Sequence, residues 1–281
     1  MSMGDRVRGL LELTRPVNAV AAGVLTFIGA FVAGGAFDLP VPTAAAVGAT
    51  IFATGAGNAI NDYFDREIDR INQPERAIPR GAVTPREALV FSVALFAAAV
   101  VLALLLPVAA ITIAVVNLVA LVAYTKLFKG LPGAGNLVVA YLGGSTFLFG
   151  GAAVGVLNEA VIVLFALAAI STLTREIVKD VEDIAGDREE GLHTLPIAIG
   201  ERNALVLGVA LLVVAVAASP APYLQQTFGL AYLLVVVPAD LVMLYAGYES
   251  FHDPTASQSH LKVGMFLAAF AFIAGRIGVI L

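Results

Sequence analysis

The chain has 281 residues, of which 59% are hydrophobic and only 13% are charged, with a formal net charge of −5. A soluble domain carries about 25% charged residues, so water would not solvate the surface that this composition gives. The composition therefore excludes a soluble globular protein and indicates an integral membrane protein. The chain has no cysteine, which excludes disulfides and thiolate metal sites.

A membrane-spanning helix needs about 20 consecutive, mostly apolar residues. By this criterion the sequence predicts nine spans, at 16–35, 42–61, 88–106, 108–128, 135–155, 159–179, 203–219, 227–247 and 260–280. Pro107 separates the third span from the fourth, and Pro220 and Pro222 follow the seventh. Because nine helices use most of the chain, we expect one all-α transmembrane domain over residues 1–281.

Lys and Arg residues fall almost entirely on one side of the predicted membrane. They precede the first span, lie between the second and third, end the fourth, surround the junction of the sixth and seventh, and open the ninth. The connections after spans one, three, five and seven contain none, and Arg276 is the one exception. The positive-inside rule makes the basic side cytoplasmic. The sequence therefore predicts a cytoplasmic N-terminus and, with nine spans, an external C-terminus.

The connection after the second span carries an unusual group of polar residues within 58–81. Asn61, Asp65 and Asp69 are spaced by four, so on a helix they lie within about 80° of arc and along about 12 Å of axis. Asp62 lies beside this stripe. Like charges at this spacing repel one another, and a bound cation would reverse the effect. Such oxygen ligands suit Mg²⁺, so the stripe is a candidate magnesium site.

The connection after the sixth span repeats this pattern. Asp183 and Asp187 are again four apart, and Asp180 precedes them on the same face. Both clusters follow an even-numbered span, which places them on the same side of the membrane. Each is followed about ten residues later by a proline, Pro79 or Pro196. This predicts two four-helix pseudo-repeats, each presenting an acidic stripe, plus a ninth helix.

Charged connections between helices are normally just solvated, and one cluster alone is better explained that way. Two clusters with matching spacing, side and proline offset favour a shared site. They resemble the two motifs of the UbiA-type prenyltransferases, in the expected connections and over nearly the whole chain. The matching residues are Asn61, Asp62, Asp65 and Asp69 for NDxxDxxxD, and Asp183 and Asp187 for DxxxD.

The resemblance implies a bundle of helices around a central cavity, in which Mg²⁺ is held against an isoprenyl diphosphate. Both stretches are most similar to members that transfer geranylgeranyl from geranylgeranyl diphosphate to the free hydroxyl of geranylgeranylglyceryl phosphate, in archaeal lipid synthesis. The diphosphate would leave, and the allylic cation would be shielded from water until the acceptor hydroxyl attacks. The implied catalytic residues are Asp65, Asp69, Asp183 and Asp187, with Asp62 and Asp180 as additional candidate metal ligands.

Other polar residues are candidates for substrate contacts. The basic residues that would stabilise charge on the departing diphosphate are Arg76, Arg80, Lys126 and Lys129. Neither lysine has the four-residue spacing from Tyr124 that many relatives show. The candidate substrate-binding residues are Arg15, Asn18, Tyr124 and Asn136. A membrane-interface anchor is as good an interpretation of Arg15, and an interhelical hydrogen bond of Asn136.

Two alternative functions fit parts of the sequence. A secondary transporter would also have an internal repeat, but its site would lie near the bilayer midplane rather than at one surface. A UbiA-type enzyme acting on an aromatic acceptor would share the metal and donor chemistry. We expect a multi-pass protein of the cell membrane whose active site faces the cytoplasm and whose partners are two prenyl lipids and the bilayer, without nucleic acid.

Overall fold

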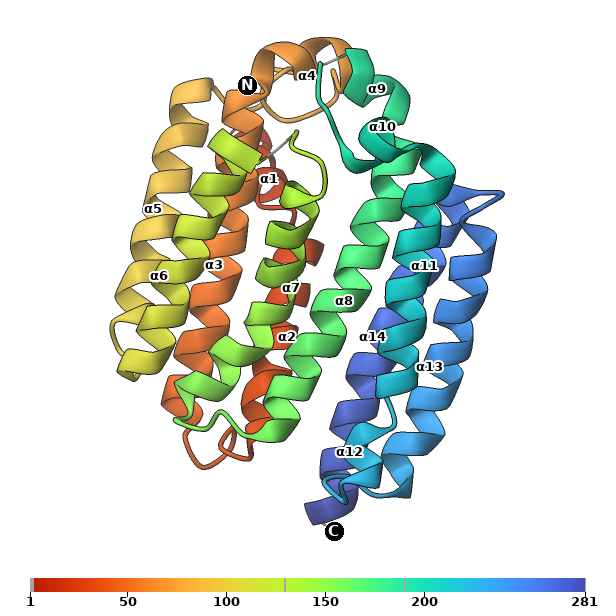
Figure 1. Cartoon of the computed structure of the whole chain (residues 1–281). Helices are drawn as coiled ribbons and strands as arrows, with labels where there is room; N and C mark the ends of the chain where they lie inside the picture. Colours follow the sequence, from red (N-terminus) through yellow and green to blue (C-terminus); the bar gives the residue numbers. More distant parts are fainter. Residues whose placement is uncertain (1–2, 129, 190, 281) are drawn as a thin grey trace.

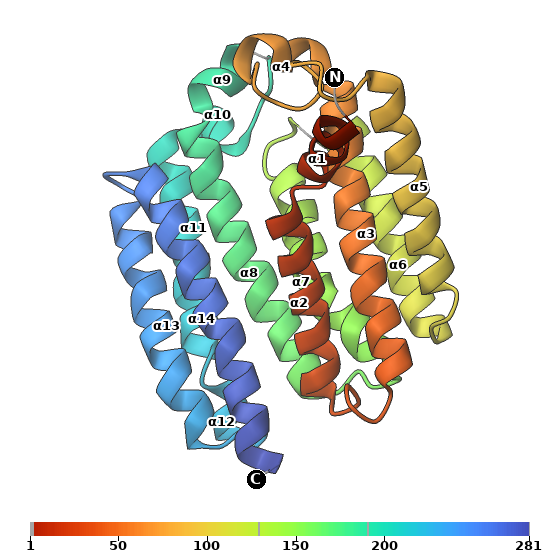
Figure 2. The same ribbon diagram turned by 180° about the vertical axis from the view of Figure 1, so that it is seen from behind.

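The computed structural model describes residues 3–128, 130–189 and 191–280 of the chain. Over these residues it contains helices and no strand, and the long helices lie side by side in a bundle (Figures 1 and 2). The elements in chain order are α1 (Met3–Leu13), α2 (Pro16–Ala33), α3 (Pro40–Phe64), α4 (Arg66–Asn72), α5 (Pro85–Ala103), α6 (Val108–Ala123), the π-helix η1 (Tyr124–Phe128), α7 (Ala134–Ala153), α8 (Glu159–Glu182), α9 (Ile184–Glu189), α10 (Leu195–Ile199), α11 (Glu201–Ala218), α12 (Ala221–Leu224), α13 (Leu230–Glu249) and α14 (Pro254–Ile280).

Within the described part of the chain, eight stretches are long and apolar enough to cross a membrane. They are α2, α3, α5, α7, α8, α13, α14 and the stretch formed by α11 with α12. The fourth predicted span corresponds to α6, which has only 16 residues before it continues into η1. Sixteen residues cover about 24 Å, which is less than the roughly 30 Å of a hydrocarbon core. The all-helical architecture with multiple apolar spans is confirmed, whereas the count of nine stays a prediction.

Local sequence signals explain where several helices begin. Pro16, Pro40 and Pro85 each stand in the first turn of a helix, where the missing backbone N–H has no partner to lose. Thr84 precedes α5 and forms a capping box with Glu87, in which each side chain bonds the backbone N–H of the other residue. These signals start α5 at Pro85, three residues before the apolar run that predicted the span at 88–106.

Helices α2 and α7 cross with almost no space between their backbones. A Cβ atom at Gly150 would lie 1.9 Å from the carbonyl oxygen of Thr26, and one at Gly29 would lie 2.2 Å from that of Phe147. Only glycine permits this approach, which is typical of closely packed membrane helices. The contact fixes α2 against α7, and so sets how the two parts of the bundle face each other.

Helices α4 and α9 lie side by side at one end of the bundle in both views, and we call this the motif end (Figures 1 and 2). A hydrophobic cluster at the opposite end joins Phe147 of α7, Val161 of α8, Tyr232 of α13 and Phe272 of α14. The rings of Tyr232 and Phe272 meet edge to face with centroids 5.1 Å apart. Apolar packing thus closes the end of the bundle opposite the motif end. Polar residues can gather at the motif end itself.

Candidate active site

Both acidic motifs lie where a long helix bends. Asp65 stands between α3 and α4 with φ −84° and ψ 1°, and Asp183 stands between α8 and α9 with φ −87° and ψ 1°. The amide of Asp65 still bonds the carbonyl of Asn61 at 2.9 Å, and that of Asp187 bonds the carbonyl of Asp183 at 3.0 Å. The four-residue hydrogen-bond register therefore survives the bend. The interpretation of each stripe as part of one continuous helix is wrong, because the helix axis changes at the middle aspartate.

The two motifs repeat each other at a constant interval along the chain. Asp180, Asp183 and Asp187 each lie 118 residues after Asp62, Asp65 and Asp69, respectively. The same interval relates the residues before α2 and α7, Arg15 and Gly133, which both have left-handed backbones with φ 47° and 71°. It also relates Asn18 to Asn136. The matching backbone supports two related halves, and it places both motifs at the motif end.

In the first motif, two buried carboxylates share guanidinium groups. Asp62 and Asp69 are 6% and 5% exposed. Arg76 donates from Nη1 to both carboxylate oxygens of Asp69, at 2.9 and 2.8 Å, and to Asp62 at 3.4 Å. Arg15 donates from Nη2 to Asp62 at 2.8 Å. Buried carboxylates need such partners, so these two arginines fix the two aspartates beneath the bend.

Arg80, a sequence candidate for diphosphate binding, contacts α1 and its own segment in the structure. Its Nη2 donates to Glu12 of α1 at 2.5 Å, and its Nη1 donates to the carbonyl of Glu75 at 2.7 Å. The hydrogen bond from Arg80 lowers the pKa of the Glu12 carboxyl below its ordinary value. Arg80 therefore ties α1 to the segment after α4, and in this arrangement its guanidinium is engaged by Glu12.

In the second motif, the aspartates have polar rather than purely cationic partners. Asn136 of α7 donates from Nδ2 to Asp180 at 2.8 Å. In the first half, the equivalent aspartate, Asp62, accepts from Arg15 instead. Lys179 forms an ion pair with Asp183 at 3.3 Å. The side chain of Asp183 is 50% exposed, against 8% and 7% for Asp62 and Asp69. The second motif is thus the more open of the two.

Further residues surround the second motif. Thr194 donates from Oγ1 to Asp187 at 3.1 Å. Tyr124, the first residue of η1, lies within electrostatic range of Glu176, Asp180 and Asp187. A π-helical turn is uncommon and often occurs at functional sites. The structure therefore brings Tyr124 and Asn136 together with the second motif, as a shared site requires.

Three sequence candidates are not placed among these residues. Lys129 lies outside the described residues, and the side chain of Lys126 does too. Asn18 is exposed at the start of α2 and lines a cavity rather than a motif. Diphosphate binding by the two lysines therefore stays a prediction.

The described residues contain no group of three or more acidic or histidine side chains close enough to hold a metal ion by themselves. This arrangement fits Mg²⁺ better than a metal that needs a complete protein cage. Mg²⁺ usually takes one or two carboxylates, several waters and the phosphate oxygens of a substrate. Asp65 and Asp183 stand at equivalent bends of the two halves, and both lie at the motif end.

Two largely apolar cavities lie within the bundle. The first-half cavity has a volume of about 330 Å³ and lies among α3, α5, α6 and α7, with Asn61 and Asn58 toward the motif end. The second-half cavity has a volume of about 420 Å³ and lies among α2, α7, α8, α11, α13 and α14. Both are large and apolar enough to take part of a lipid chain.

Sequence reasoning did not select two groups that the structure places near the motifs. Glu176 and Lys179 lie on the face of α8 that also carries Asp180 and Asp183. Their spacing of three and four residues was available as a signal, because such residues share one face of a helix. Arg175 and Lys262 line the second-half cavity, although the sequence used them only to orient the chain.

The family model described as UbiA prenyltransferase family matches residues 22–270. The chain therefore belongs to the UbiA prenyltransferase family, and the predicted resemblance is confirmed. A digeranylgeranylglyceryl phosphate synthase of Natronomonas pharaonis is 66% identical over 276 residues, which cover 98% of this chain and 99% of the relative. A multi-pass membrane protein follows from this family and from the apolar helices.

Solved structures show the same fold. That of a digeranylgeranylglyceryl phosphate synthase has a TM-score of 0.82 at 36% identity, and the match covers 97% of this chain and 99% of that one. A UbiA homologue from Archaeoglobus fulgidus, solved with GPP and Mg²⁺, has a TM-score of 0.69 at 18% identity, over 96% of this chain and 99% of that one. At that identity the likeness concerns the fold alone.

Proposed function

We propose that this chain transfers a geranylgeranyl group from geranylgeranyl diphosphate to the free hydroxyl of geranylgeranylglyceryl phosphate, with Mg²⁺ as cofactor. The observation that carries the proposal is the pair of equivalent acidic motifs at one end of an apolar bundle (Figure 1). Its support comes from the 66% identity to the Natronomonas pharaonis synthase over nearly the full length of both chains. Divalent metal use is supported by the Mg²⁺ found in the Archaeoglobus fulgidus homologue.

The proposal treats residues 1–281 as one prenyltransferase domain with its motif end in the cytoplasm. Arg15, Arg76 and Lys179 lie at this end, and the positive-inside rule then favours a cytoplasmic N-terminus. In this proposal α6 and η1 together form the fourth of the nine spans, since 21 residues are about the length that a bilayer requires. The donor and acceptor would enter from the membrane at the cytoplasmic leaflet.

Two groups of motif residues would have different roles. Those that would hold Mg²⁺ are Asn61, Asp65 and Asp69 of the first motif and Asp183 and Asp187 of the second. When bound, Mg²⁺ would neutralise the diphosphate and make it a better leaving group. Asp62 and Asp180 lie outside the spacing of four and are bonded to Arg15 and Asn136, so the proposal makes them positioning residues rather than main ligands.

The remaining residues would orient the donor and protect the reaction. Arg76 keeps Asp69 in one orientation, and it can also reach a diphosphate oxygen with the N–H groups that the carboxylates leave free. Lys179 lies beside Asp183, where a cation would stabilise the charge that develops on the departing diphosphate. The roles of Arg80, Lys126 and Lys129 in binding diphosphate remain part of the proposal.

The bond changes are those of an alkyl transfer. The C–O bond between the prenyl C1 and the diphosphate breaks, and its electron pair leaves with the diphosphate. The acceptor hydroxyl oxygen forms the new bond to C1 and releases its proton to a carboxylate of the motifs or to the diphosphate. Apolar side chains of the two cavities exclude water, which would otherwise react with the allylic cation.

The proposal is tested with purified protein and radiolabelled geranylgeranyl diphosphate. The acceptor panel contains geranylgeranylglyceryl phosphate, 4-hydroxybenzoate and dihydroxynaphthoate, each with Mg²⁺ and with a chelator. We expect one labelled product, from the glyceryl phosphate lipid, and its loss on chelation. Turnover only with an aromatic acid would overturn the acceptor assignment and leave the class intact. Accumulation of an unchanged prenyl lipid in liposomes, with no product from any acceptor, would indicate a transporter.

A further inference from the structure

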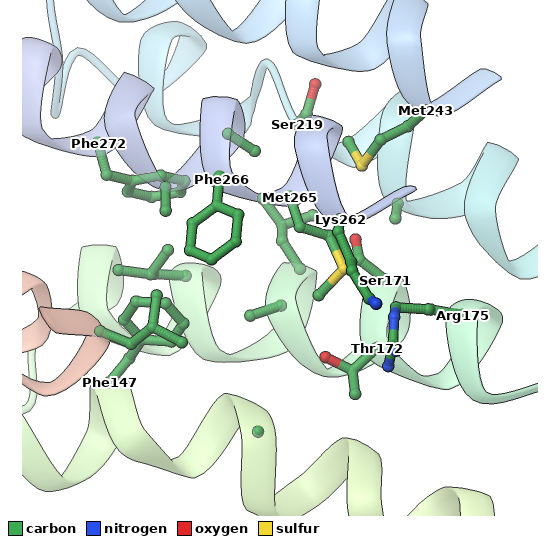
Figure 3. A pocket seen from close by; sticks show the side chains of 18 of the residues that line it. Phe147, Ser171, Thr172, Arg175, Ser219, Met243, Lys262, Met265, Phe266 and Phe272 are labelled. Atoms are coloured by element: carbon green, nitrogen blue, oxygen red, sulfur yellow. The ribbon is translucent and has the colours of Figure 1, made fainter. Parts of the chain in front are cut away.

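The second-half cavity has an apolar part and a basic end, and it is also lined by Asp240, whose carboxyl accepts a hydrogen bond from Ser219. Phe147, Phe266 and Phe272 line the apolar part, and Arg175 and Lys262 line the other end (Figure 3). Such a distribution matches an amphiphile with an anionic headgroup and a hydrocarbon chain. None of these residues belongs to the acidic motifs, so the cavity offers a second binding site beside the one for the diphosphate.

Lys262 is an exposed residue that also lines this cavity. It lies in the third turn of α14, and Figure 3 shows its amine directed toward the guanidinium of Arg175. A lysine near a helix end usually extends to the membrane surface. Among the described residues Lys262 has no ion-pair partner, whereas Arg175 pairs with Glu176, so the three groups together keep a net positive charge. Two cations directed toward one point form a binding site for an anion.

Arg175 is held in place but keeps a free donor. Its Nη1 pairs with Glu176 at 2.6 Å, and its Nη2 donates to Gln258 at 2.9 Å. Gln258 in turn donates to Glu182, which fixes the position of its amide. The Nε of Arg175 is buried and has no partner. A buried donor without a protein partner costs about 1–3 kcal/mol, so the guanidinium keeps an N–H that would gain from a further acceptor.

Three other basic residues of the motif end pair with carboxylates of the acidic motifs, whereas the partner of Arg175, Glu176, belongs to neither motif. Arg15 and Arg76 bind Asp62 and Asp69, and Lys179 binds Asp183. These residues serve the diphosphate site. A second substrate that carries its own phosphate, with a charge of about −1.5 to −2 at pH 7, needs separate positive charge. Arg175 and Lys262 are the described pair that lines a cavity and meets this need.

We propose that Arg175 and Lys262 bind the phosphate of the acceptor lipid, whose prenyl chain lies along the apolar part of the second-half cavity. This inference rests on the proposed function, because it assumes a phosphate-bearing acceptor. Arg175 precedes Asp180 by five residues on α8, which is about 8 Å along the helix axis and about 140° around it. In the proposal the glyceryl phosphate held at Arg175 extends past this turn of α8, and its free hydroxyl lies toward the second acidic motif, where the donor ionises.

The test compares Lys262→Met with Lys262→Arg and with Arg202→Met. The first removes the cation and keeps an unbranched apolar side chain, and the second restores the charge. Arg202 is exposed at the start of α11 and does not line the cavity, so it controls for general loss of surface charge. The KM for acceptor and the KM for donor are measured separately, in nanodiscs of uncharged lipid. The Kd of each substrate is measured in the same discs by fluorescence quenching.

We expect Lys262→Met to raise the KM and the Kd for the acceptor about 10- to 100-fold, the range of one lost charge-assisted hydrogen bond. The KM for donor should change less than about threefold, since the diphosphate contacts are untouched. Geranylgeranylglycerol, which lacks the phosphate, should bind the wild type and Lys262→Met equally well. Lys262→Arg should recover most of the affinity, and Arg202→Met should behave as the wild type.

Three outcomes would overturn the inference. Lys262→Met could retain the wild-type preference for the phosphorylated acceptor, or it could raise the KM for donor as much as that for acceptor. Its effect could also appear only in anionic bilayers, which would assign the basic pair to a bulk lipid headgroup. Failure of the proposed function looks different, because the wild type itself would then produce nothing from geranylgeranylglyceryl phosphate in any of these assays.

Discussion

Removing the guanidinium of Arg76 should destabilise the fold, because it leaves two buried carboxylates that repel each other without their shared cation. Arg76→Met keeps the length of the side chain and deletes its contacts of 2.8 and 2.9 Å to Asp69 and of 3.4 Å to Asp62. The side chains of these aspartates are only 7% and 8% exposed, so water cannot replace the lost partner. Breaking a buried pair costs about 3–5 kcal/mol.

The side chain of Arg76 is itself 32% exposed, so solvent screens part of the interaction. We therefore expect the free energy of unfolding to fall by about 2–3 kcal/mol, as measured by equilibrium unfolding in mixed detergent without metal. The matched control is Arg70→Met, because Arg70 forms an exposed ion pair with Glu67 at 2.8 Å. Such a pair contributes about 0.2–1 kcal/mol.

A double-mutant cycle separates the pairing from other effects of the substitution. Adding Asp69→Asn to Arg76→Met removes the unpaired charge, so the double variant should be more stable than Arg76→Met alone. Mg²⁺ should also recover part of the loss, since a cation can take the place of the guanidinium beside Asp69. Equal stabilities of Arg76→Met and Arg70→Met would refute the reasoning, as would strict additivity in the cycle.

Three further predictions follow from local structure. Gly150→Ala should prevent accumulation of folded protein, since its Cβ would lie 1.9 Å from a backbone oxygen, whereas Gly57→Ala, with 3.8 Å to its nearest neighbour, should purify normally. Arg15→Gly should be about 1 kcal/mol more stable to unfolding than Arg15→Ala. Both variants lose the ion pair with Asp62, but only alanine keeps the strain of the left-handed backbone at position 15. Equal stabilities of the two variants would contradict this. The pKa of Glu12 is lowered in the folded state, so its carboxylate contributes stability above its unfolded pKa of about 4.3, and this stability is lost as the pH falls through the folded pKa. Glu12→Gln should therefore flatten the acid limb of a plot of melting temperature against pH. An unchanged acid limb would count against the ion pair with Arg80.

The spans and the positions of both motifs could be predicted because their signals are local. Apolar runs report membrane crossing, and the spacing of four at Asp65 and Asp183 reports a common helix face. The bends at these aspartates could not be predicted, since no glycine or proline marks them. The end of α6 was missed for a similar reason. Hydropathy continues through Tyr124, but it carries no information about the change of hydrogen-bond register there.

Contacts between distant segments account for the other differences. Arg80 lies near the first motif in sequence, yet the return of the chain brings it to Glu12. Conversely, Arg175 and Lys262 come from two helices that only the folded bundle brings to one cavity. Sequence spacing identifies residues that share a helix, but it does not show which helices pack together.

The central claim is that both acidic motifs bind one prenyl diphosphate through Mg²⁺. Its most direct test is binding of the unreactive analogue geranylgeranyl thiodiphosphate to the wild type, Asp65→Asn and Asp183→Asn, each with Mg²⁺ and with a chelator. The account predicts that each single substitution, one in each motif, weakens Mg²⁺-dependent binding at least about tenfold while the protein stays folded. Wild-type affinity in either variant, or binding that is indifferent to chelation, would contradict it.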